Sequence, residues 1–223
     1  MSTEEKSTGK NYVPALGFAW LTPVYDLAVS ALTRENKWRK TLAQQINPKP
    51  ANKILDVGCG TGSLLLLLKK LEPEAYVTGL DPDKAVLSIA RKKIEKQGLS
   101  INFINGFFDP ELFSSNQQFD KVTSSLVLHQ VPLEEKNRIL KTAFELLQKG
   151  GSIHIADYGL QRTWLMRSLF NIIQILDGYE FTTPNAKGVV PEIMRDIGFS
   201  DVEEKEVIQT PTGSISVYFG RKG

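Results

Sequence analysis

The chain has 223 residues, of which 41% are hydrophobic and 23% are charged, and its net charge is only +2. A chain of this length can form one α/β domain that buries roughly 70% of the surface exposed by the unfolded chain. The small net charge argues against a partner that must be a polyanion, such as a nucleic acid.

Cysteine content and hydropathy indicate in which cellular compartment the protein is expected. Cys59 is the single cysteine, so no intramolecular disulfide can form and we expect a protein of the reducing cytoplasm. The first ten residues are polar and lack the apolar core of a signal peptide. The longest apolar run, Leu64 to Leu68, is too short to cross a bilayer, so no stable membrane insertion is expected. No cluster of histidine, cysteine and carboxylate residues has ligand spacing, and no metal is expected.

The first fifty residues differ from the rest of the chain. Residues 1–10 are expected to form a polar tail, and apolar residues between Tyr12 and Ile46 recur at the spacing of short helices. Pro48 and Pro50 then close this segment. We therefore expect a tail and helical segment over residues 1–50 and one globular unit over residues 51–223.

From Lys53 onward, strands and helices alternate, which predicts a parallel sheet with helices on both faces. The expected strands are 53–57, 75–80, 101–104, 120–127, 151–156, 202–209 and 214–220. The expected helices are 62–71, 83–97, 133–148, 162–177 and 188–197. Only Thr210 to Gly213 join the last two strands, and so short a link indicates an antiparallel hairpin.

The most informative run covers residues 54–62, with the sequence ILDVGCGTG. It predicts a buried strand that breaks into a glycine turn and enters a helix. The glycines let the backbone approach a ligand with no Cβ in the way, and the start of a helix favours negative charge. Asp81 falls at the end of the next expected strand, where a carboxylate can accept both hydroxyls of a ribose. The combination predicts a site for a nucleotide-like ligand.

This combination resembles the class I S-adenosylmethionine-dependent methyltransferases, whose first motif has the form (I/L)-L-D-(V/I)-G-C-G-T-G. The resemblance implies a Rossmann-like, seven-stranded, mostly parallel sheet with one antiparallel strand, helices on both faces and an N-terminal helical lid. It also implies that S-adenosyl-L-methionine is the cofactor and S-adenosyl-L-homocysteine the product. Asp81 maps onto the family's ribose acid.

Further cofactor contacts follow from the resemblance. Gly58 and Gly60 let the backbone approach the methionine and ribose parts, and Cys59 lies between them as a small residue in a tight turn. Asp56 orders the turn or meets the α-ammonium group, directly or through water. Pro82 packs beside the adenine.

The end of the third expected strand departs from the family pattern. Relatives have Gly-Asp there, with the Asp accepting a hydrogen bond from the adenine amino group, whereas Gly106 is followed here by Phe107. Either Phe107 or Phe108 stacks on the adenine, helped by backbone contacts, or Asp109 reaches back to it. The alternative is that both rings belong to the core.

The stretch 119–132 resembles the fourth motif of small-molecule methyltransferases. Leu126 is expected to pass under the cofactor, and His129 to stand where the activated methyl group meets the acceptor. His129 then acts as a general base, orients an acceptor oxygen, or packs the loop before the next helix. His154, in the middle of an expected strand, is expected to be structural.

Two segments outside these motifs refine the resemblance. The run 23–27 with Tyr25 in it, followed by Trp38-Arg39, resembles the Y-D…W-(K/R) pattern of ubiquinone/menaquinone biosynthesis C-methyltransferases. It implies that Tyr25 lies near the methionine end of the cofactor, or packs within the lid. The stretch 177–182 is expected to be a loop that closes over the acceptor.

Together these features predict transfer of a methyl group to a carbon, oxygen or nitrogen atom of a small, apolar or aromatic acceptor. The (N/D/S)-P-P-(Y/F) string of nucleic-acid amino-methyltransferases is absent at 125–128, and so is the glutamate pair of protein arginine methyltransferases. The glycine spacing opposes a nicotinamide-dependent dehydrogenase. A non-catalytic S-adenosylmethionine-binding scaffold or sensor stays open because of Phe107. A homo-oligomer is neither predicted nor excluded.

Overall fold

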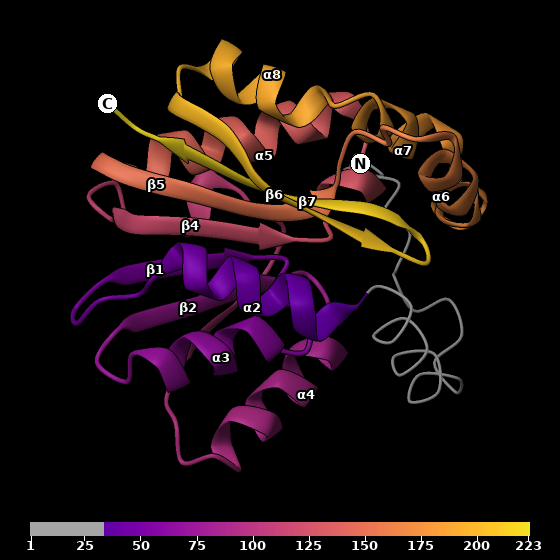
Figure 1. Ribbon diagram of the computed structural model, residues 1–223. Coiled ribbons are helices and arrows are strands. Elements are labelled where there is room, and N and C mark those ends of the chain that lie inside the picture. Colours follow the sequence, from indigo (N-terminus) through magenta and orange to yellow (C-terminus); the bar gives the residue numbers. More distant parts are fainter. Residues whose placement is uncertain (1–33) are drawn as a thin grey trace, which may run out of the picture.

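The structure is a computed structural model that describes residues 34–223, built around one seven-stranded sheet (Figure 1). The strands are β1 (Lys53–Val57), β2 (Tyr76–Asp81), β3 (Asn102–Asn105), β4 (Phe119–Ser125), β5 (Leu147–Tyr158), β6 (Ser200–Thr210) and β7 (Gly213–Arg221). Their order is β3-β2-β1-β4-β5-β7-β6, and β7 is antiparallel to both of its neighbours whereas the other pairs are parallel. The predicted sheet with one antiparallel strand is confirmed.

Helices cover both faces of the sheet. They are α2 (Glu35–Ile46), α3 (Ser63–Leu71), α4 (Lys84–Glu95), α5 (Leu133–Leu146), α6 (Trp164–Asp177), α7 (Tyr179–Ala186) and α8 (Val189–Ile197), with 3-10 turns η1 (Pro110–Leu112) and η2 (Leu128–Gln130). Helices α2 and α3 share one core cluster, and α5 and α8 share the other. Helices α6 and α7 lie near the end to which the β4 arrowhead points (Figure 1). Within residues 34–223, no helix has the length and apolar character that a membrane span requires.

The strand order reverses between β1 and β4, and this reversal positions the site. From β1 the chain continues through β2 to β3 on one side of the sheet, and it then returns to β4 on the other side of β1. The loops that follow β1 and β4 therefore leave the sheet in opposite directions. Open α/β sheets bind ligands at such a point, at the carboxyl ends of the strands.

Helix α2 belongs to the core of the sheet domain. Trp38, Leu42 and Ile46 recur every four residues, so they share one helical face, and each is at most 1% exposed. This face packs on α3, β5 and β7. Residues 35–46 are thus part of the globular unit, although the sequence predicted a boundary at residue 50. The predicted tail and Tyr25 lie outside the described residues.

Residues 177–182 do not form the predicted loop, because a short helix, α7, begins at Tyr179. Threonines and Pro184 disfavour a helix here on propensity alone, but tertiary contacts outweigh propensity. Thr182 is fully buried and its hydroxyl donates to the carbonyl of Gly178, at 2.7 Å. Asn185 is also buried and donates to the carbonyl of Tyr158, at 3.0 Å. The expectation of a loop was therefore wrong.

A fully buried lysine joins three elements on the side of the sheet that carries α5. Lys136 of α5 has no exposed surface, and its ammonium group donates to three carbonyl oxygens. Two of these belong to Leu128 and Val131 around η2, at 2.5 and 2.6 Å, and the third belongs to Phe181 of α7, at 2.9 Å. Burial lowers the pKa of Lys136 to about 8, although Asp157 opposes this shift. The three acceptors compensate for the desolvation of the charge.

We expect Lys136→Met to lower the free energy of unfolding by about 3 kcal/mol, because three carbonyl groups lose their donor while the volume of the side chain is conserved. Lys141→Met, on an exposed position of the same helix, is the control and should change stability by less than about 0.5 kcal/mol. Urea unfolding measures both. Equal stability of the two variants would contradict the structural role of Lys136.

Candidate active site

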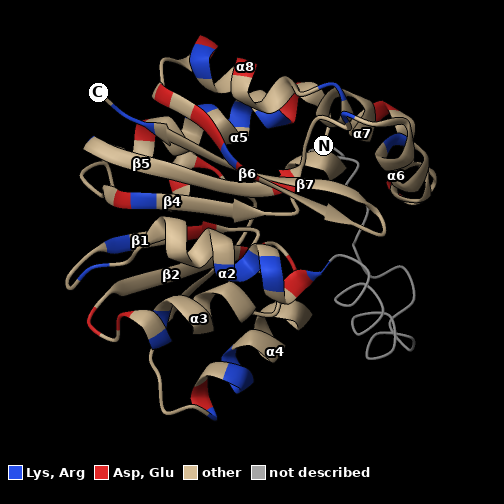
Figure 2. Cartoon of the chain, viewed as in Figure 1, with Lys and Arg blue, Asp and Glu red and all other residues tan. Residues whose placement is uncertain are grey.

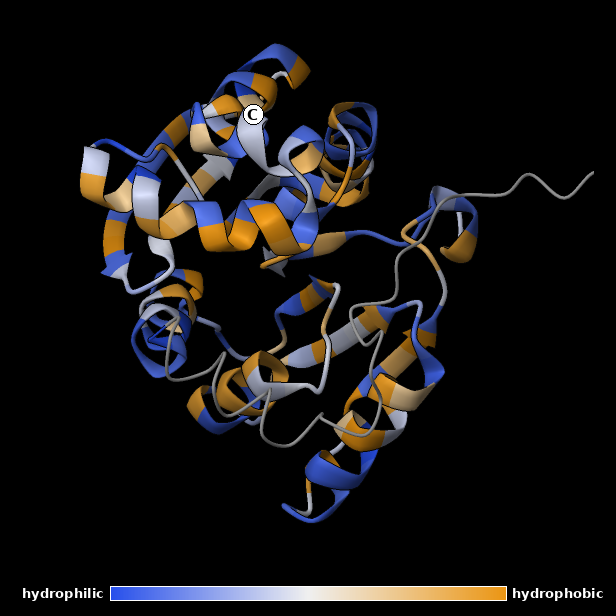
Figure 3. Ribbon diagram, turned by 90° about the vertical axis from the view of Figure 1, so that its right-hand side faces the viewer, coloured by the Kyte–Doolittle hydropathy of each residue, from blue (hydrophilic) through white to orange (hydrophobic). Residues whose placement is uncertain are grey.

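A pocket of about 110 Å³ lies at the carboxyl end of β1. Figure 3, which turns the right-hand side of Figure 1 toward the viewer, looks onto this end of the sheet. The lining residues come from α2, the glycine loop, the start of α3 and the end of β4: Trp38, Arg39, Gly58, Cys59, Gly60, Thr61, Ser63, Leu64, Ser125 and Leu126. The pocket therefore lies against the motif that the sequence singled out.

The glycine loop, residues 58–62, has a left-handed backbone at each glycine. The φ angles are 70° at Gly58, 53° at Gly60 and 74° at Gly62. A Cβ on Gly58 would lie 2.3 Å from Cγ2 of Val127, so a side chain cannot be accommodated there without a shift. The N–H groups of Gly58 and Cys59 donate to the carbonyl of Leu80, at 2.8 and 3.0 Å. The loop is thus fixed to the end of β2.

Asp81, at the end of β2, is 9% exposed and holds the loop from the other side. One carboxylate oxygen accepts from the N–H of Gly60 and the other from the N–H of Asp83, both at 2.9 Å. Burial raises the pKa of Asp81, and these two N–H groups oppose the shift. The amide of Asn105 donates to the carbonyls of Asp81 and Pro82, at 3.1 and 2.9 Å. Asn105 therefore fixes the turn that presents the carboxylate.

Asp56 is fully buried in β1, and neither of its carboxylate oxygens has a hydrogen-bond partner among the described residues. Burial raises its pKa to about 8, while Arg39 lowers it and Asp81 raises it further. Nε1 of Trp38 and Nε of Arg39 are likewise buried without a partner in residues 34–223. Buried polar atoms without partners are rare in native proteins, so a ligand that supplies the partners is a physical reason for them.

The two aromatic residues after Gly106 occupy different environments. Phe108 is 4% exposed and its ring packs edge-on against Phe113, with a centroid distance of 6.1 Å. Phe107 is 41% exposed. Asp109 accepts from the N–H of Glu111 and begins η1 rather than reaching back toward Asp81. Of the two rings named for the adenine, only that of Phe107 is accessible, whereas that of Phe108 belongs to the core.

Leu126 follows β4 and lines the pocket in a left-handed conformation, with φ of 55°. Its N–H donates to the carbonyl of Ala156, at 2.9 Å, which holds the residue beside β5. A branched residue rarely adopts this backbone conformation, and such strain often occurs at functional sites. Leu126 thus lines the same pocket as the glycine loop, and its place under the cofactor stays a prediction.

His129 is 2% exposed, in η2, and both ring nitrogens face carboxylates. Nδ1 lies 2.7 Å from Asp157 and Nε2 lies 3.3 Å from Asp177. Burial disfavours the charged ring, but the two carboxylates outweigh it and raise the pKa of His129 to about 9. The ring is therefore protonated at neutral pH, without a lone pair to accept a proton. Its role as a general base stays a prediction that this geometry does not favour.

Other residues of this end of the sheet were not assigned by sequence reasoning. Trp38 and Arg39 were noted for a family pattern but not placed at the ligand. Asn105 carried no signal, and Asp177 was predicted only as the first residue of a loop over the acceptor. Both Trp38 and Arg39 belong to α2, outside the sequence motifs, so their place at the pocket can be recognised only from the packing of α2 against the sheet domain. The carboxylate of Asp157, at the end of β5, accepts from three donors, which belong to Leu128, His129 and Tyr158.

The chain is similar to known methyltransferases. Residues 54–151 match the model of a methyltransferase domain family. Similar curated proteins include demethylmenaquinone methyltransferases of Listeria welshimeri, 29% identical over 144 residues, and of Thermus thermophilus, 31% identical over 143 residues. Each match covers 63% of this chain, and the two cover 60% and 64% of the relatives. The matched region spans less than two thirds of the length of these relatives.

Solved structures resemble the fold over more of the chain. An O-methyltransferase family protein from Burkholderia thailandensis has a TM-score of 0.72 and 18% identity, over 89% of this chain and 58% of that one. A magnesium protoporphyrin IX methyltransferase from Synechocystis, with bound SAM, has a TM-score of 0.65 and 17% identity, over 96% and 87% of the two chains. At these identities the likeness concerns the fold.

We expect Gly58→Ala to destabilise the protein by about 2 kcal/mol more than Gly98→Ala, because only the new methyl group at position 58 overlaps a neighbour. Gly98 has a similar φ of 67° with open space around its Cα, so it controls for backbone strain. In a Val127→Ala background the excess cost should disappear. Urea unfolding of the four variants measures these differences in stability. If Gly58→Ala still cost more stability in the Val127→Ala background, the proposed overlap would be contradicted.

We expect Asp56→Asn to raise stability at pH 7.5 by at least about 1 kcal/mol. The folded-state pKa of about 8 exceeds the ordinary 3.8, so this carboxyl costs stability progressively from pH 4 to pH 8 and by a constant amount above. The advantage of the variant should vanish below about pH 4. Urea unfolding as a function of pH measures it. Asp157→Asn, which weakens satisfied contacts, should instead destabilise.

Proposed function

We propose that this chain, whose residues 54–151 match the model of a methyltransferase domain family, is a class I S-adenosylmethionine-dependent methyltransferase that transfers a methyl group from S-adenosyl-L-methionine to a small-molecule acceptor. The single observation that carries the proposal is the buried carboxylate of Asp81, hydrogen-bonded to Gly60 of the glycine loop at 2.9 Å. Each oxygen of Asp81 accepts one backbone hydrogen bond and keeps acceptor capacity for a ribose hydroxyl.

The polar groups around the pocket fit the methionine end of the cofactor. That end carries one carboxylate and one ammonium group, and the site offers an opposite charge for each. Arg39 and Nε1 of Trp38 are donors for the carboxylate, and both have buried nitrogens without a described partner. Asp56, two residues before Gly58, is an acceptor for the ammonium group, directly or through water. Binding would thus satisfy polar atoms that burial alone leaves unpaired.

The rest of the cofactor site is formed by backbone and by apolar side chains. Gly60 leaves open space where a side chain would stand, whereas the corresponding space at Gly58 is filled by Val127, and Cys59 is only 7% exposed. Pro82 and Gly106 directly follow β2 and β3, and the exposed Phe107 follows Gly106; the adenine is proposed to lie at these strand ends. Leu126 lines the pocket from the end of β4.

The bound sulfonium supplies an already activated methyl group, so the protein has to align the acceptor and exclude water. Leu126 and Ser125 face the pocket from the end of β4 and are placed to limit access of water. The sequence predicted a catalytic role for His129. We propose instead that His129 supports the part of the pocket lined by Ser125 and Leu126 through its contacts, and does not remove a proton.

We propose that the acceptor is a small aromatic or apolar compound, methylated on carbon, oxygen or nitrogen. The similarity to demethylmenaquinone methyltransferases supports an aromatic ring of the hydroquinone type. Helix α6 supports an apolar acceptor, because Trp164, Ile175 and Leu176 are more than 60% exposed at this end of the molecule. It also carries fewer charged residues than α4 (Figure 2).

A second candidate function is a non-catalytic S-adenosylmethionine-binding scaffold or sensor. Phe107, which stands where the family has an adenine-binding Asp, is the observation that favours it. Binding of the cofactor without turnover of any acceptor would support this alternative. A cytoplasmic location and the exclusion of nucleic acid as acceptor remain predictions from the sequence.

The decisive test is calorimetric titration of the full chain with S-adenosylhomocysteine, with NADH as control, followed by transfer of a labelled methyl group to a panel of hydroquinones, phenols and amines. We expect micromolar binding of S-adenosylhomocysteine, no binding of NADH, and Asp81→Ala to lose at least about tenfold in affinity, about 1.4 kcal/mol. Asp109→Asn should bind as the wild type does, because its side chain only caps η1.

Each outcome separates the alternatives. No binding of S-adenosylhomocysteine by the wild type would overturn the proposed function. Unchanged affinity in Asp81→Ala would overturn the proposed ribose site, and a loss of affinity in Asp109→Asn would assign the adenine contact to Asp109.

A further inference from the structure

A cluster of buried charges joins the end of β5 to helices α6 and α7. Its members are His129 of η2, Asp157 of β5, Asp177 at the end of α6 and Lys136 of α5. The side chains of His129 and Asp157 are at most 3% exposed, and that of Asp177 is 28% exposed. Charges are seldom buried unless they are paired, so these contacts are strongly constrained.

Asp157 fixes the β5 side of this cluster. One carboxylate oxygen accepts from the N–H of Leu128, and the other accepts from Nδ1 of His129 and from the N–H of Tyr158, all at 2.7 Å. The ring of His129 also packs edge-on against Tyr158, with a centroid distance of 4.9 Å. The position of the imidazole is therefore set by β5 and not by the pocket.

Asp177 provides the contact on the side of α6. Its Oδ2 lies 3.3 Å from Nε2 of His129, and the chain then turns at Gly178, with φ of 92°, into α7. Lys136 adds a parallel connection, since its ammonium group bonds the carbonyls of Leu128 and of Phe181 in α7. Turn η2 is thus tied to both helices, two residues after the pocket-lining Leu126.

We propose that His129 is a positioning residue: its ring joins Asp157 at the end of β5 to Asp177 at the end of α6, and so holds α6 and α7 on the acceptor side of the site. This role rests on the proposed function in one respect only: the side that α6 and α7 cover is identified as the side where the acceptor binds. The positioning role takes the place of the general-base role predicted for His129, because a ring bonded to two carboxylates has no free lone pair with which to remove a proton.

The charge of the ring makes the connection dependent on pH. Asp157, Asp177, Tyr158 and Lys136 are the titratable groups that face it, and Glu180 on α7 is exposed. The pKa of His129 is about 9, above the ordinary 6.5, so its contribution is complete below pH 6.5 and is lost as the pH rises through 9. Lys136, with a pKa of about 8, loses its charge in the same window. Variants must therefore separate the two groups.

The test compares Asp177→Asn with the wild type by backbone amide hydrogen exchange and by histidine ring NMR. We expect residues 128–131 and 178–186 to exchange about tenfold faster in the variant at pH 7, because one support of the helices is lost while Lys136 is kept. At pH 10 the two proteins should exchange alike. His129→Gln, which can donate to Asp157 but not to both carboxylates, should behave as Asp177→Asn does.

The ring signals report on the mechanism itself. His154 is the second histidine, and burial lowers its pKa to about 3, so it serves as a neutral reference. His129 should carry two ring protons at pH 7.5, and Asp177→Asn should lower its pKa by at least about one unit. If the contact between Asp177 and His129 did not involve a charged ring, Asp177→Asn would leave the pKa of His129 unchanged.

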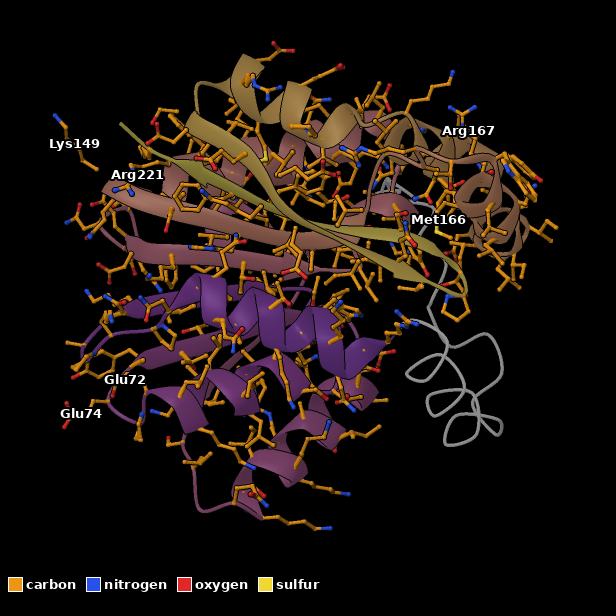
Figure 4. All side chains as sticks on the ribbon, in the orientation of Figure 1. Glu72, Glu74, Lys149, Met166, Arg167 and Arg221 are labelled. Atoms are coloured by element: carbon orange, nitrogen blue, oxygen red, sulfur yellow. The ribbon has the colours of Figure 1, made fainter. Side chains whose placement is uncertain are left out.

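Asp201→Asn is the matched control, because it breaks an ion pair with Arg221 (3.5 Å), which lies at the opposite end of the molecule (Figure 4). It should leave the exchange of α6 and α7 unchanged. Wild-type exchange in Asp177→Asn at pH 7, or a neutral His129 at pH 7.5, would overturn the proposal. Binding of S-adenosylhomocysteine is measured separately, so failure of the proposed function would leave this result standing.

Discussion

The structure of the site depends on hydrogen bonds between the glycine loop and the end of β2. Leu80 accepts two of them through its carbonyl, from Gly58 and Cys59, and Asp81 accepts the third through its side chain, from Gly60. They hold the loop in a left-handed path that only glycine adopts at low cost. This constraint sets the direction in which α3 leaves the loop. It also fixes the part of the pocket that the loop lines and the position of the Asp81 carboxylate.

Buried charge is distributed unevenly along the carboxyl ends of the strands. Around β5, Asp157 and Lys136 each make three contacts, so these groups stabilise the native packing. Around β1, Asp56 and Nε of Arg39 have no hydrogen-bond partner among the described residues. A buried polar group with its partners serves the fold, whereas one without them costs stability unless a ligand supplies the partner. The contrast separates the edge around β1, where we propose that the cofactor binds, from the edge around β5, where the buried groups stabilise the packing.

The fold was predictable because its signals are local. The run from Ile54 to Gly62 encodes a strand and the glycine turn that leads into a helix, all within nine residues, and the short link at Thr210 to Gly213 determines the antiparallel hairpin. Helix α7 was missed because its stability comes from buried contacts of Thr182 and Asn185, which no periodicity reveals. The site was only partly predictable for the same reason. Asp81 follows from the motif, but the pairing of His129 with Asp177 spans 48 positions and requires the packing of α6.

The buried carboxyl of Asp56, which has no hydrogen-bond partner among residues 34–223, has a consequence for the energetics of ligand binding. With a pKa of about 8 it retains its proton at neutral pH, although an ammonium group beside it would favour the ionised form. Occupation of the site by such a group therefore releases a proton to the solvent. The heat of binding then contains the ionisation enthalpy of the buffer, and the slope of that heat against buffer enthalpy counts the protons that leave.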